Sequence, residues 1–450
     1  MKIINYFSFL FFCILLSCNS GTPNCDSKCK EAIATFPKTS ITKAFRFHLY
    51  MHKQYKNIPE LTNKLQYYLN NEGQMESLSA SFYEKRSHQY SYQIKDYCFS
   101  PDNTKILTAS NDSTICLWDK SSLQNVLTIP FEEIPEIVVF SPNGKMIAAT
   151  SDNSDKVTFF DVENGKMLFS LTNKEAKECE TINIEFSLDG KYFHYTRRNE
   201  NTIATEVYDI ATQSAIAEFK TLPKKCQGDE KDSYSAHFTL DGKKIVKIEG
   251  EYLKIWDIKP QKLAHNIKAH IYCINNIAFS PDSKSIVTSS ADGTAKIWDI
   301  ETGKLLMEID AEIKDNHYHN TSATFSSDGK QLATAINDII KIWDISTGKA
   351  ILNYTLINEP RSKKIQFSPD GKILMANSPQ YSNISIWDFS SKGIAHYNKT
   401  PKYTNYWNGK ILTKSVFSPD SKNVLIGRYY KIDLWYVGLH KFLLEVAHLD

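Results

Sequence analysis

Short runs of alternating apolar and polar residues follow one another along most of this chain, a pattern that predicts β-strands joined by tight turns. One run ends at Phe279, and residues 285–290, 294–299 and 305–309 form the next three. The turns between such runs contain Pro, which fixes φ, Asp, which bonds back to the backbone, and Gly, which accepts a positive φ. Alternation within each strand places one set of apolar side chains on each face of the predicted sheet.

This four-strand pattern recurs eight times, with a spacing of 41 to 52 residues. In every copy the first strand ends in Phe, just before a turn similar to Ser-Pro-Asp-Gly-Lys; these are Phe99, Phe140, Phe186, Phe238, Phe279, Phe325, Phe367 and Phe417. The third strand ends in an aromatic residue, which precedes Asp in seven of the eight copies: Trp118, Phe160, Tyr208, Trp256, Trp298, Trp343, Trp387 and Trp435. A repeat of this length predicts one small sheet per copy.

The order of the strands, the turn chemistry and the period together resemble WD40 repeats from near Tyr92 to the C-terminus. The resemblance implies an all-β fold, a β-propeller with eight four-stranded WD40-like blades. A ring of seven blades is the alternative if repeat two or three packs irregularly. Two segments compete to complete the last blade, residues 79–90 before the first repeat and residues 440–447 after the last.

Repeat five also resembles the family in a set of four residues, His270, Thr288, Asp292 and Trp298. A buried imidazole needs partners for both nitrogens, and a carboxylate and a hydroxyl supply them. The same residue types occur in hydrolases, but the chain has no Gly-x-Ser-x-Gly turn that would expose a nucleophile. The resemblance therefore implies a structural hydrogen-bond tetrad that fastens the strands of one blade, and no catalysis is expected.

The first 17 residues are predicted to be a signal peptide, because Lys2 is followed by an apolar run too short to span a membrane comfortably. The sequence Leu-Leu-Ser before Cys18 resembles a bacterial lipobox, which implies cleavage before Cys18 and its acylation with chains such as palmitate. We therefore expect a lipoprotein anchored in the bacterial cell envelope, and Asn19 favours the outer membrane. An ordinary cleaved signal and a transmembrane anchor are the alternatives.

Residues 18–76 differ from the repeats and are predicted to form a tether and a helical segment ahead of the propeller at residues 77–450. Thr39 and Ser40 can cap a first helix, and Pro59 can start a second. We expect a helical hairpin that packs on the propeller or acts as a spacer. Binding of its basic side chains to a membrane surface is the alternative.

The chain contains nine cysteines, and removal of the one in the signal and the one at the lipidation site leaves seven. An odd number cannot all pair within one chain. The candidate disulfides are Cys25–Cys29 and Cys179–Cys226. Zinc binding by Cys25 and Cys29 is not expected, because no second pair of ligands follows at a suitable spacing.

In WD40 rings, partners commonly bind the face formed by the loops that join each outer strand to the next inner strand. Three loops of this kind are long here, at residues 220–235, 310–322 and 398–413. The last contains Tyr403, Tyr406 and Trp407 beside lysines, the composition of an interaction hot spot, so these three residues are candidate partner-binding residues. The alternative is that Trp407 covers the channel or a blade flank.

A weak candidate metal site consists of Asp315, His317 and His319, since alternate residues of an extended segment point the same way. The flanking Asn residues favour an ordinary polar turn instead. The net charge of +2 and the absence of a basic domain argue against nucleic-acid binding. We expect an interaction scaffold for an unidentified protein partner, with no cofactor and no small-molecule substrate. The alternative is an envelope enzyme, or a metal- or cofactor-binding propeller protein.

Overall fold

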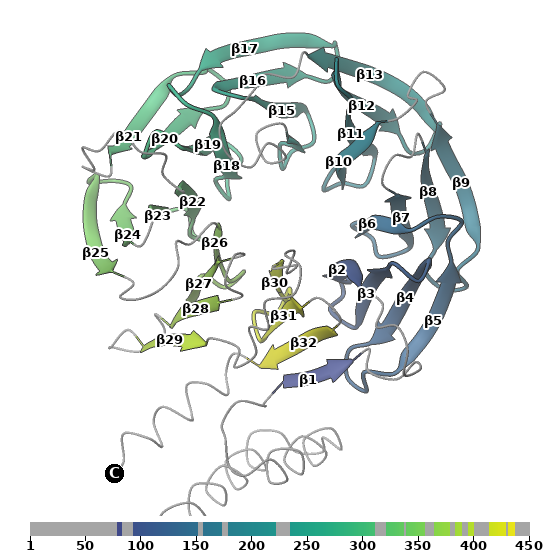
Figure 1. The fold of residues 1–450 in the computed structure, drawn as a ribbon. Helices are drawn as coiled ribbons and strands as arrows, with labels where there is room; N and C mark the ends of the chain where they lie inside the picture. The colour runs from purple at the N-terminus through teal and green to yellow at the C-terminus, as the bar shows by residue number, and fades with distance from the viewer. Residues whose placement is uncertain are drawn as a thin grey trace, which may run out of the picture. The chain divides into compact units, whose positions relative to one another are not determined.

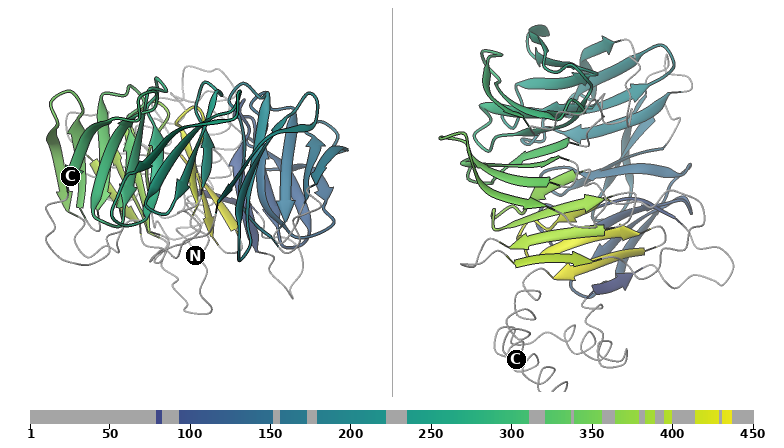
Figure 2. Two further views of the ribbon diagram at one scale, coloured as in Figure 1. Left: turned by 90° about the horizontal axis from the view of Figure 1, so that it is seen from above. Right: turned by 60° about the vertical axis from the view of Figure 1, so that its left-hand side comes forward.

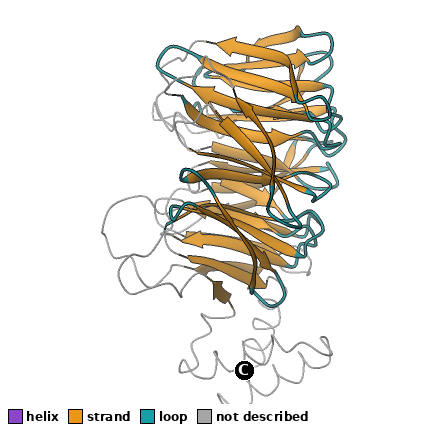
Figure 3. Ribbon diagram, turned by 90° about the vertical axis from the view of Figure 1, so that its right-hand side faces the viewer, coloured by secondary structure: helices purple, strands orange, loops and turns teal. Residues whose placement is uncertain are grey.

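The computed structural model describes residues 79–82, 93–151, 156–172, 179–221, 235–310, 321–336, 339–355, 364–378, 383–388, 395–399, 414–428 and 431–436. These residues form strands, turns and loops and contain no helix (Figure 3). Over the same residues, no helix has the length and apolar character needed to cross a membrane. Cys18 and the predicted helices at residues 39–76 lie outside the described residues.

The strands form eight antiparallel sheets of four strands each, and neighbouring sheets succeed one another around a ring (Figures 1 and 2). The predicted eight-bladed propeller is confirmed, and the seven-bladed alternative is wrong. Repeats two and three, the weakest in sequence, each form a complete blade. Each blade runs from an innermost to an outermost strand in chain order, except that the outermost strand of blade 8 comes from the start of the chain.

The first four blades comprise the following strands: blade 1, β2 (Ile94–Phe99), β3 (Lys105–Ser110), β4 (Thr114–Asp119) and β5 (Asn125–Pro130); blade 2, β6 (Pro135–Phe140), β7 (Met146–Ser151), β8 (Lys156–Asp161) and β9 (Met167–Thr172); blade 3, β10 (Glu180–Phe186), β11 (Tyr192–Arg198), β12 (Ile203–Asp209) and β13 (Ser214–Thr221); blade 4, β14 (Ala236–Phe238), β15 (Lys244–Glu249), β16 (Tyr252–Asp257) and β17 (Lys262–Lys268).

The other four blades comprise these strands: blade 5, β18 (Ile274–Phe279), β19 (Ser285–Ser290), β20 (Thr294–Asp299) and β21 (Leu305–Asp310); blade 6, β22 (Thr321–Phe325), β23 (Gln331–Ile336), β24 (Ile339–Asp344) and β25 (Lys349–Thr355); blade 7, β26 (Lys364–Phe367), β27 (Ile373–Ser378), β28 (Asn383–Asp388) and β29 (Ala395–Lys399); blade 8, β30 (Ser415–Phe417), β31 (Asn423–Arg428), β32 (Lys431–Tyr436) and β1 (Ser79–Phe82).

The repeated turn after each innermost strand is held by its own polar side chains. In blade 5, Ser280 Oγ donates to Asp282 Oδ1 at 2.6 Å and accepts the amide of Ser285 at 2.9 Å. Asp282 Oδ1 also accepts the amide of Lys284 at 3.1 Å. The turn therefore satisfies its backbone locally, which explains why the same residue types recur at the end of every innermost strand.

The hydrophobic core lies between the blades. Each of the eight interfaces between neighbouring blades contains a cluster of buried apolar side chains. Between blades 1 and 2, for example, the cluster includes Leu107, Val138 and Ile147. Full burial of one such side chain contributes about 1.5–3 kcal/mol, so every blade is stabilised by both of its neighbours.

The ring closes through the start of the chain. Strand β1 pairs antiparallel with β32, with Ser79 opposite Trp435, and so completes blade 8. Of the two predicted closing segments, residues 79–90 supply this strand, while residues 440–447 lie outside the described residues. Asp96 of blade 1 connects the blades on either side of it. Its carboxylate accepts a hydrogen bond from Lys414 Nζ, next to the first strand of blade 8, at 2.5 Å and one from the Val138 amide of blade 2 at 3.1 Å.

The predicted Cys179–Cys226 disulfide is wrong, because Cys179 is not disulfide-bonded. Its sulfur accepts a hydrogen bond from the side chain of Asn199 at 3.6 Å. Cys273, at the start of blade 5, is disulfide-bonded, and its partner lies outside the described residues.

Candidate interaction face

An exposed apolar pair occupies the loop that leads from blade 4 into blade 5. This loop, residues 269–273, joins outer strand β17 to inner strand β18. Ile271 is 75% exposed and Tyr272 is 41% exposed, whereas Ala269 and His270 beside them are buried. Contiguous exposed apolar side chains mark contact sites more often than single ones, and Ile271 and Tyr272 are adjacent.

A chain of hydrogen bonds connects this loop to strands β19 and β20 and to the turn between them. Trp298 Nε1 donates to Thr288 Oγ1 at 2.9 Å, and Thr288 Oγ1 lies 2.7 Å from His270 Nε2. His270 Nδ1 lies 3.0 Å from a carboxylate oxygen of Asp292. Because a carboxylate only accepts, the proton of His270 belongs on Nδ1, and Thr288 donates to Nε2. The structure thus brings the four residues singled out in the sequence into one network.

The same contacts favour the ionised form of the Asp292 carboxyl group. Burial of Asp292 opposes its ionisation, but the hydrogen bonds that its carboxylate accepts from His270, the Thr294 hydroxyl and the Thr294 amide outweigh burial and lower the pKa of Asp292. The Asp292 carboxylate also accepts the backbone amide of Ile271 at 3.2 Å. Thr288 is fully buried, so its hydroxyl is not presented to a substrate. The arrangement holds a loop rather than a nucleophile.

Backbone contacts fix both ends of the same loop. Ser290 Oγ donates to the carbonyl oxygens of Tyr272 at 3.1 Å and Cys273 at 2.9 Å. At the other end, the amide of Ala269 donates to the carbonyl of Glu251 at 3.0 Å. Together with the disulfide at Cys273, these bonds order the loop before any partner arrives, which lowers the entropy lost on binding.

The sequence did not single out Ile271 and Tyr272. The signal was present, since two apolar residues follow the family histidine in a loop where polar residues are usual. The candidate binding residues Tyr403, Tyr406 and Trp407 lie outside the described residues, as do Asp315, His317 and His319. Within the described part of the chain, no group of three or more His, Cys, Asp or Glu side chains is placed to hold a metal ion.

Blade 3 fills the equivalent positions with a different network. The strand register places Tyr195 where blade 5 has Thr288, and Tyr208 where it has Trp298. Both tyrosine hydroxyls donate to the buried carboxylate of Glu206, at 3.3 Å from Tyr195 and 2.6 Å from Tyr208. Arg197, also buried, forms an ion pair with Glu206. This blade therefore encloses a charged pair where blade 5 encloses an imidazole and an indole.

Blade 4 places a lysine at the same position. Lys247 is equivalent to Thr288 by register and is fully buried. Its ammonium group donates to the carbonyl of Phe219 at 3.0 Å and to Thr221 Oγ1 at 3.3 Å, both on the outer strand of blade 3. Burial lowers the pKa of Lys247 to about 8, against the attraction of Glu249. Lys247 thus joins blade 4 to blade 3.

The ring of four-stranded sheets, the repeated turn and the tetrad of blade 5 define the described part of this chain as a WD40-type β-propeller. The family profile "WD domain, G-beta repeat" matches residues 81–119, in blade 1 and its preceding strand, and residues 261–299, ending in blade 5. These two segments are WD40 repeats. They include the blade that carries the complete tetrad.

Similar proteins include apoptotic protease-activating factor 1 of Rattus norvegicus, 25% identical over 74% of this chain and 25% of that protein. The guanine nucleotide-binding protein subunit beta of Oryza sativa subsp. indica is 24% identical over 67% of this chain and 82% of that protein. Autophagy-related protein 16 of Arabidopsis thaliana is 22% identical over 74% of this chain and 56% of that protein. The chain thus spans only a quarter of the length of the apoptotic factor.

Among solved structures, the computationally designed protein Ika8 is similar, with a TM-score of 0.58 at 19% sequence identity. The likeness covers 77% of this chain and 97% of the designed chain. At this identity the likeness supports the fold alone.

Proposed function

We propose that this chain is a scaffold that binds a protein partner through the loop at Ile271 and Tyr272. The observation that carries the proposal is the 75% exposure of Ile271 on a loop that the tetrad, Ser290 and a disulfide all fix. A side chain presented in this way serves as an anchor, because the partner gains apolar burial without having to order the loop. The WD40-type propellers among its relatives support a scaffold as the class of protein.

The partner expected at this site presents an apolar hollow. The aliphatic body of Ile271 fills the hollow, and the phenol of Tyr272, 41% exposed, combines an apolar ring with a polar tip. Aromatic residues of this kind are enriched in interface cores. A shallow, mainly apolar pocket on a folded protein fits these two side chains.

The test is photo-crosslinking in intact cells, followed by identification of the attached protein and a binding assay with that protein. Ile271→Asp should weaken binding about 30-fold or more, the loss of an anchor contributing at least about 2 kcal/mol. The matched control is Leu188→Asp, since Leu188 is 63% exposed but lies in the turn after β10, at the opposite end of an inner strand. Equal affinity of the two variants would show that the loop is not the binding site.

We propose in addition that Cys18 is lipidated and holds the protein at the outer membrane of a bacterial cell. The lipobox-like sequence before Cys18 and the position of Asn19 support this anchor. The disulfide at Cys273 suits an oxidising compartment outside the cytoplasm. Metabolic labelling with palmitate should mark the wild-type chain and not Cys18→Ser, and fractionation should move that variant out of the membrane. A Cys18→Ser chain that stays labelled and membrane-bound would refute the anchor.

A further inference from the structure

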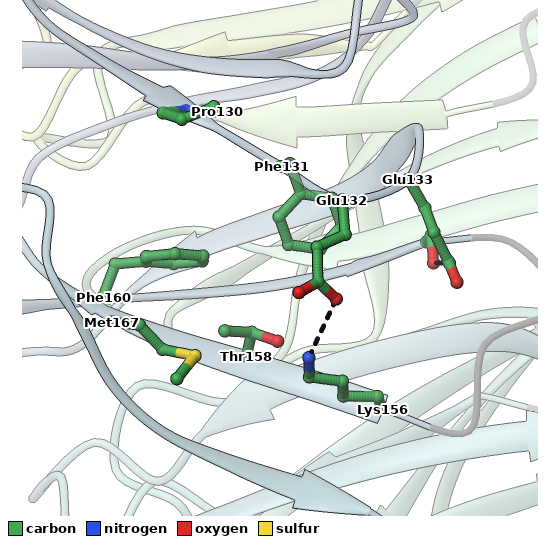
Figure 4. Close-up of a pocket in the computed structure, with 9 residues that line it drawn as sticks. Pro130, Phe131, Glu132, Glu133, Lys156, Thr158, Phe160 and Met167 are labelled. Atoms are coloured by element: carbon green, nitrogen blue, oxygen red, sulfur yellow. Dashed lines mark hydrogen bonds and ion pairs between the residues drawn. The ribbon is translucent and has the colours of Figure 1, made fainter.

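A pocket of about 210 Å³ opens between blades 1 and 2, far along the chain from the Ile271 loop (Figure 4). Its floor comes from alternate residues of β8, and its rim comes from the loop that leads from β5 into β6. The lining consists of Pro130, Phe131, Glu132, Glu133, Ser151, Lys156, Thr158, Phe160 and Met167. An aromatic pair lies at one end, with the rings of Phe131 and Phe160 centred 6.1 Å apart.

The pocket occurs where blade 2 lacks the family tetrad. Phe131 precedes the inner strand of blade 2 by the same number of residues as His270 precedes that of blade 5. The strand registers place Phe160 where blade 5 has Trp298. They also place Ala149 where blade 5 has Thr288. An indole and a hydroxyl are thus replaced by smaller apolar groups, and the unfilled volume remains open to the surface.

The rim of the pocket is polar and carries one net negative charge. Lys156 Nζ pairs with Glu132 at 3.1 Å, and the Glu132 side chain is 85% exposed. A second carboxylate, Glu133, accepts a hydrogen bond from Ser151. Two carboxylates therefore face one ammonium group at the mouth of an apolar hollow.

We propose that this pocket binds one large apolar side chain of an extended peptide segment that carries Lys or Arg beside that side chain. The volume is below the roughly 300–1,000 Å³ of sites for small molecules, but it suits a single Leu, Met or Phe side chain. The spare carboxylate charge at the rim favours a neighbouring cation. This second binding site goes beyond the loop at Ile271 and does not depend on it.

The surroundings of the pocket suit an extended partner. Strand β9 is the outermost strand of blade 2, and its first residue, Met167, lines the pocket. Met167 is 61% exposed, and Ile134 and Leu168, each adjacent to the lining or the rim, are both 46% exposed. A peptide lying along this edge can place one side chain in the pocket and its flanks over these residues.

The experiment uses the full chain and fluorescein-labelled heptapeptides Gly-Ser-Arg-X-Arg-Ser-Gly, with X as Leu, Met, Phe or Ala. Fluorescence anisotropy should show binding with Leu, Met or Phe and at least ten-fold weaker binding with Ala. A second series with Glu in place of both Arg residues should bind at least ten-fold more weakly than the first. Equal binding of the two series, or no binding of any peptide at millimolar concentration, would overturn the proposal.

Two variants locate the binding. Met167→Ser should weaken binding of the best peptide at least ten-fold, because it removes apolar lining without adding charge, while Leu305→Ser, the same strand position in blade 5, should leave it unchanged. Both side chains are exposed, at 61% and 44%, so neither substitution threatens the fold. Phe160→Trp, which fills the pocket with the residue of blade 5, should also abolish binding in a chain that melts normally. Loss of binding in Leu305→Ser as well as Met167→Ser would overturn the assignment to this pocket.

Discussion

Blades 5 and 3 pair their second and third strands in the same register, but they fill equivalent interior positions with opposite chemistry. In blade 5 the buried groups are mostly neutral, and one ionised carboxylate, Asp292, sits at the edge of the network. In blade 3 the ion pair of Arg197 and Glu206 lies inside the blade, and the hydroxyls of two tyrosines complete it. The same type of four-stranded blade therefore accommodates either polar set, because most of the buried polar groups in each set form hydrogen bonds or ion pairs.

The two buried networks differ in the free energy that is lost when one of their residues is removed. In blade 5, removing a neutral partner leaves an unsatisfied hydrogen-bonding group, which costs about 1–3 kcal/mol. In blade 3, removing one charge leaves the other buried and uncompensated, which costs about 3–5 kcal/mol. Blade 3 should therefore be the more sensitive to single substitutions, although its sequence departs further from the family pattern.

The largest effect is expected for Glu206→Ala in blade 3. This change leaves Arg197, with a side chain only 7% exposed, without its buried partner, and should lower the free energy of unfolding by about 3–5 kcal/mol. Urea unfolding followed by tyrosine and tryptophan fluorescence measures it. The control is Glu218→Ala, because Glu218 also approaches Arg197, at 3.7 Å, but its side chain is 35% exposed. The control should lose no more than about 1 kcal/mol, and equal losses would refute a special role for Glu206.

The next effect concerns Lys247, which links blade 4 to blade 3. The pKa of Lys247 is about 8 in the folded chain, below its ordinary value of 10.5. Between these two pH values, Lys247 is therefore more fully protonated in the unfolded chain than in the folded chain. The free energy of unfolding should therefore rise as pH increases from about 8 to about 10.5, by roughly 3 kcal/mol in total. Unfolding curves at pH 7.5, 9 and 10 measure the rise.

Two variants test the assignment to Lys247. Lys247→Met should remove this pH-dependent rise and increase stability below pH 8, because no charge is then buried. Lys243→Met, at a lysine whose side chain is 80% exposed, should leave the rise unchanged. Parallel pH profiles of the wild type and Lys247→Met would assign the rise to other groups.

The strands and turns could be predicted because their signals are local. Alternation over six residues decides which face of a strand is apolar, and Ser280 and Asp282 satisfy their own turn. The tetrad of blade 5 was predicted from resemblance, since His270 and Asp292 stand at the family spacing. These features depend on residues within one repeat, so the sequence of that repeat was sufficient.

Other features depend on three-dimensional relations that no repeat encodes. The exposure of Ile271 is one such feature. It depends on the path of its loop, which the bond between the Ile271 amide and Asp292 of the tetrad helps to fix. Cys179 was one candidate for a disulfide and Cys273 was not, whereas Cys273 is disulfide-bonded and Cys179 is not. The pocket of blade 2 could be recognised only once the structure had placed Phe131 next to Phe160, at the positions that His270 and Trp298 occupy in blade 5.

A smaller effect than either of the first two is expected at His270 in blade 5. His270→Ala removes the partner of Asp292 and Thr288 and should lower the free energy of unfolding by about 1–3 kcal/mol. It should also weaken partner binding at Ile271, because the loop loses its support from below. His265→Ala is the control, since its bond to the carbonyl of Glu301 lies at the surface. The same loss in both variants would argue against the tetrad as the support of the loop.

The smallest effect on stability is expected in blade 2, where the pocket has space for a tryptophan at the position that Trp298 occupies in blade 5. Phe160→Trp should change the free energy of unfolding by less than about 1.5 kcal/mol, because the larger ring enters existing space instead of displacing neighbours. The reverse change, Trp298→Phe in blade 5, should cost more, since it leaves a cavity and removes the donor to Thr288.

Adding Ala149→Thr to Phe160→Trp sharpens the comparison, because a hydroxyl at this position can accept the new indole N–H as Thr288 accepts that of Trp298. The double variant should be about 0.5–1 kcal/mol more stable than the sum of the two single changes predicts. A double-mutant cycle by urea unfolding measures this coupling. Zero coupling would mean that the side chains of blade 2 do not meet as those of blade 5 do, and that the pocket does not arise from the missing tetrad.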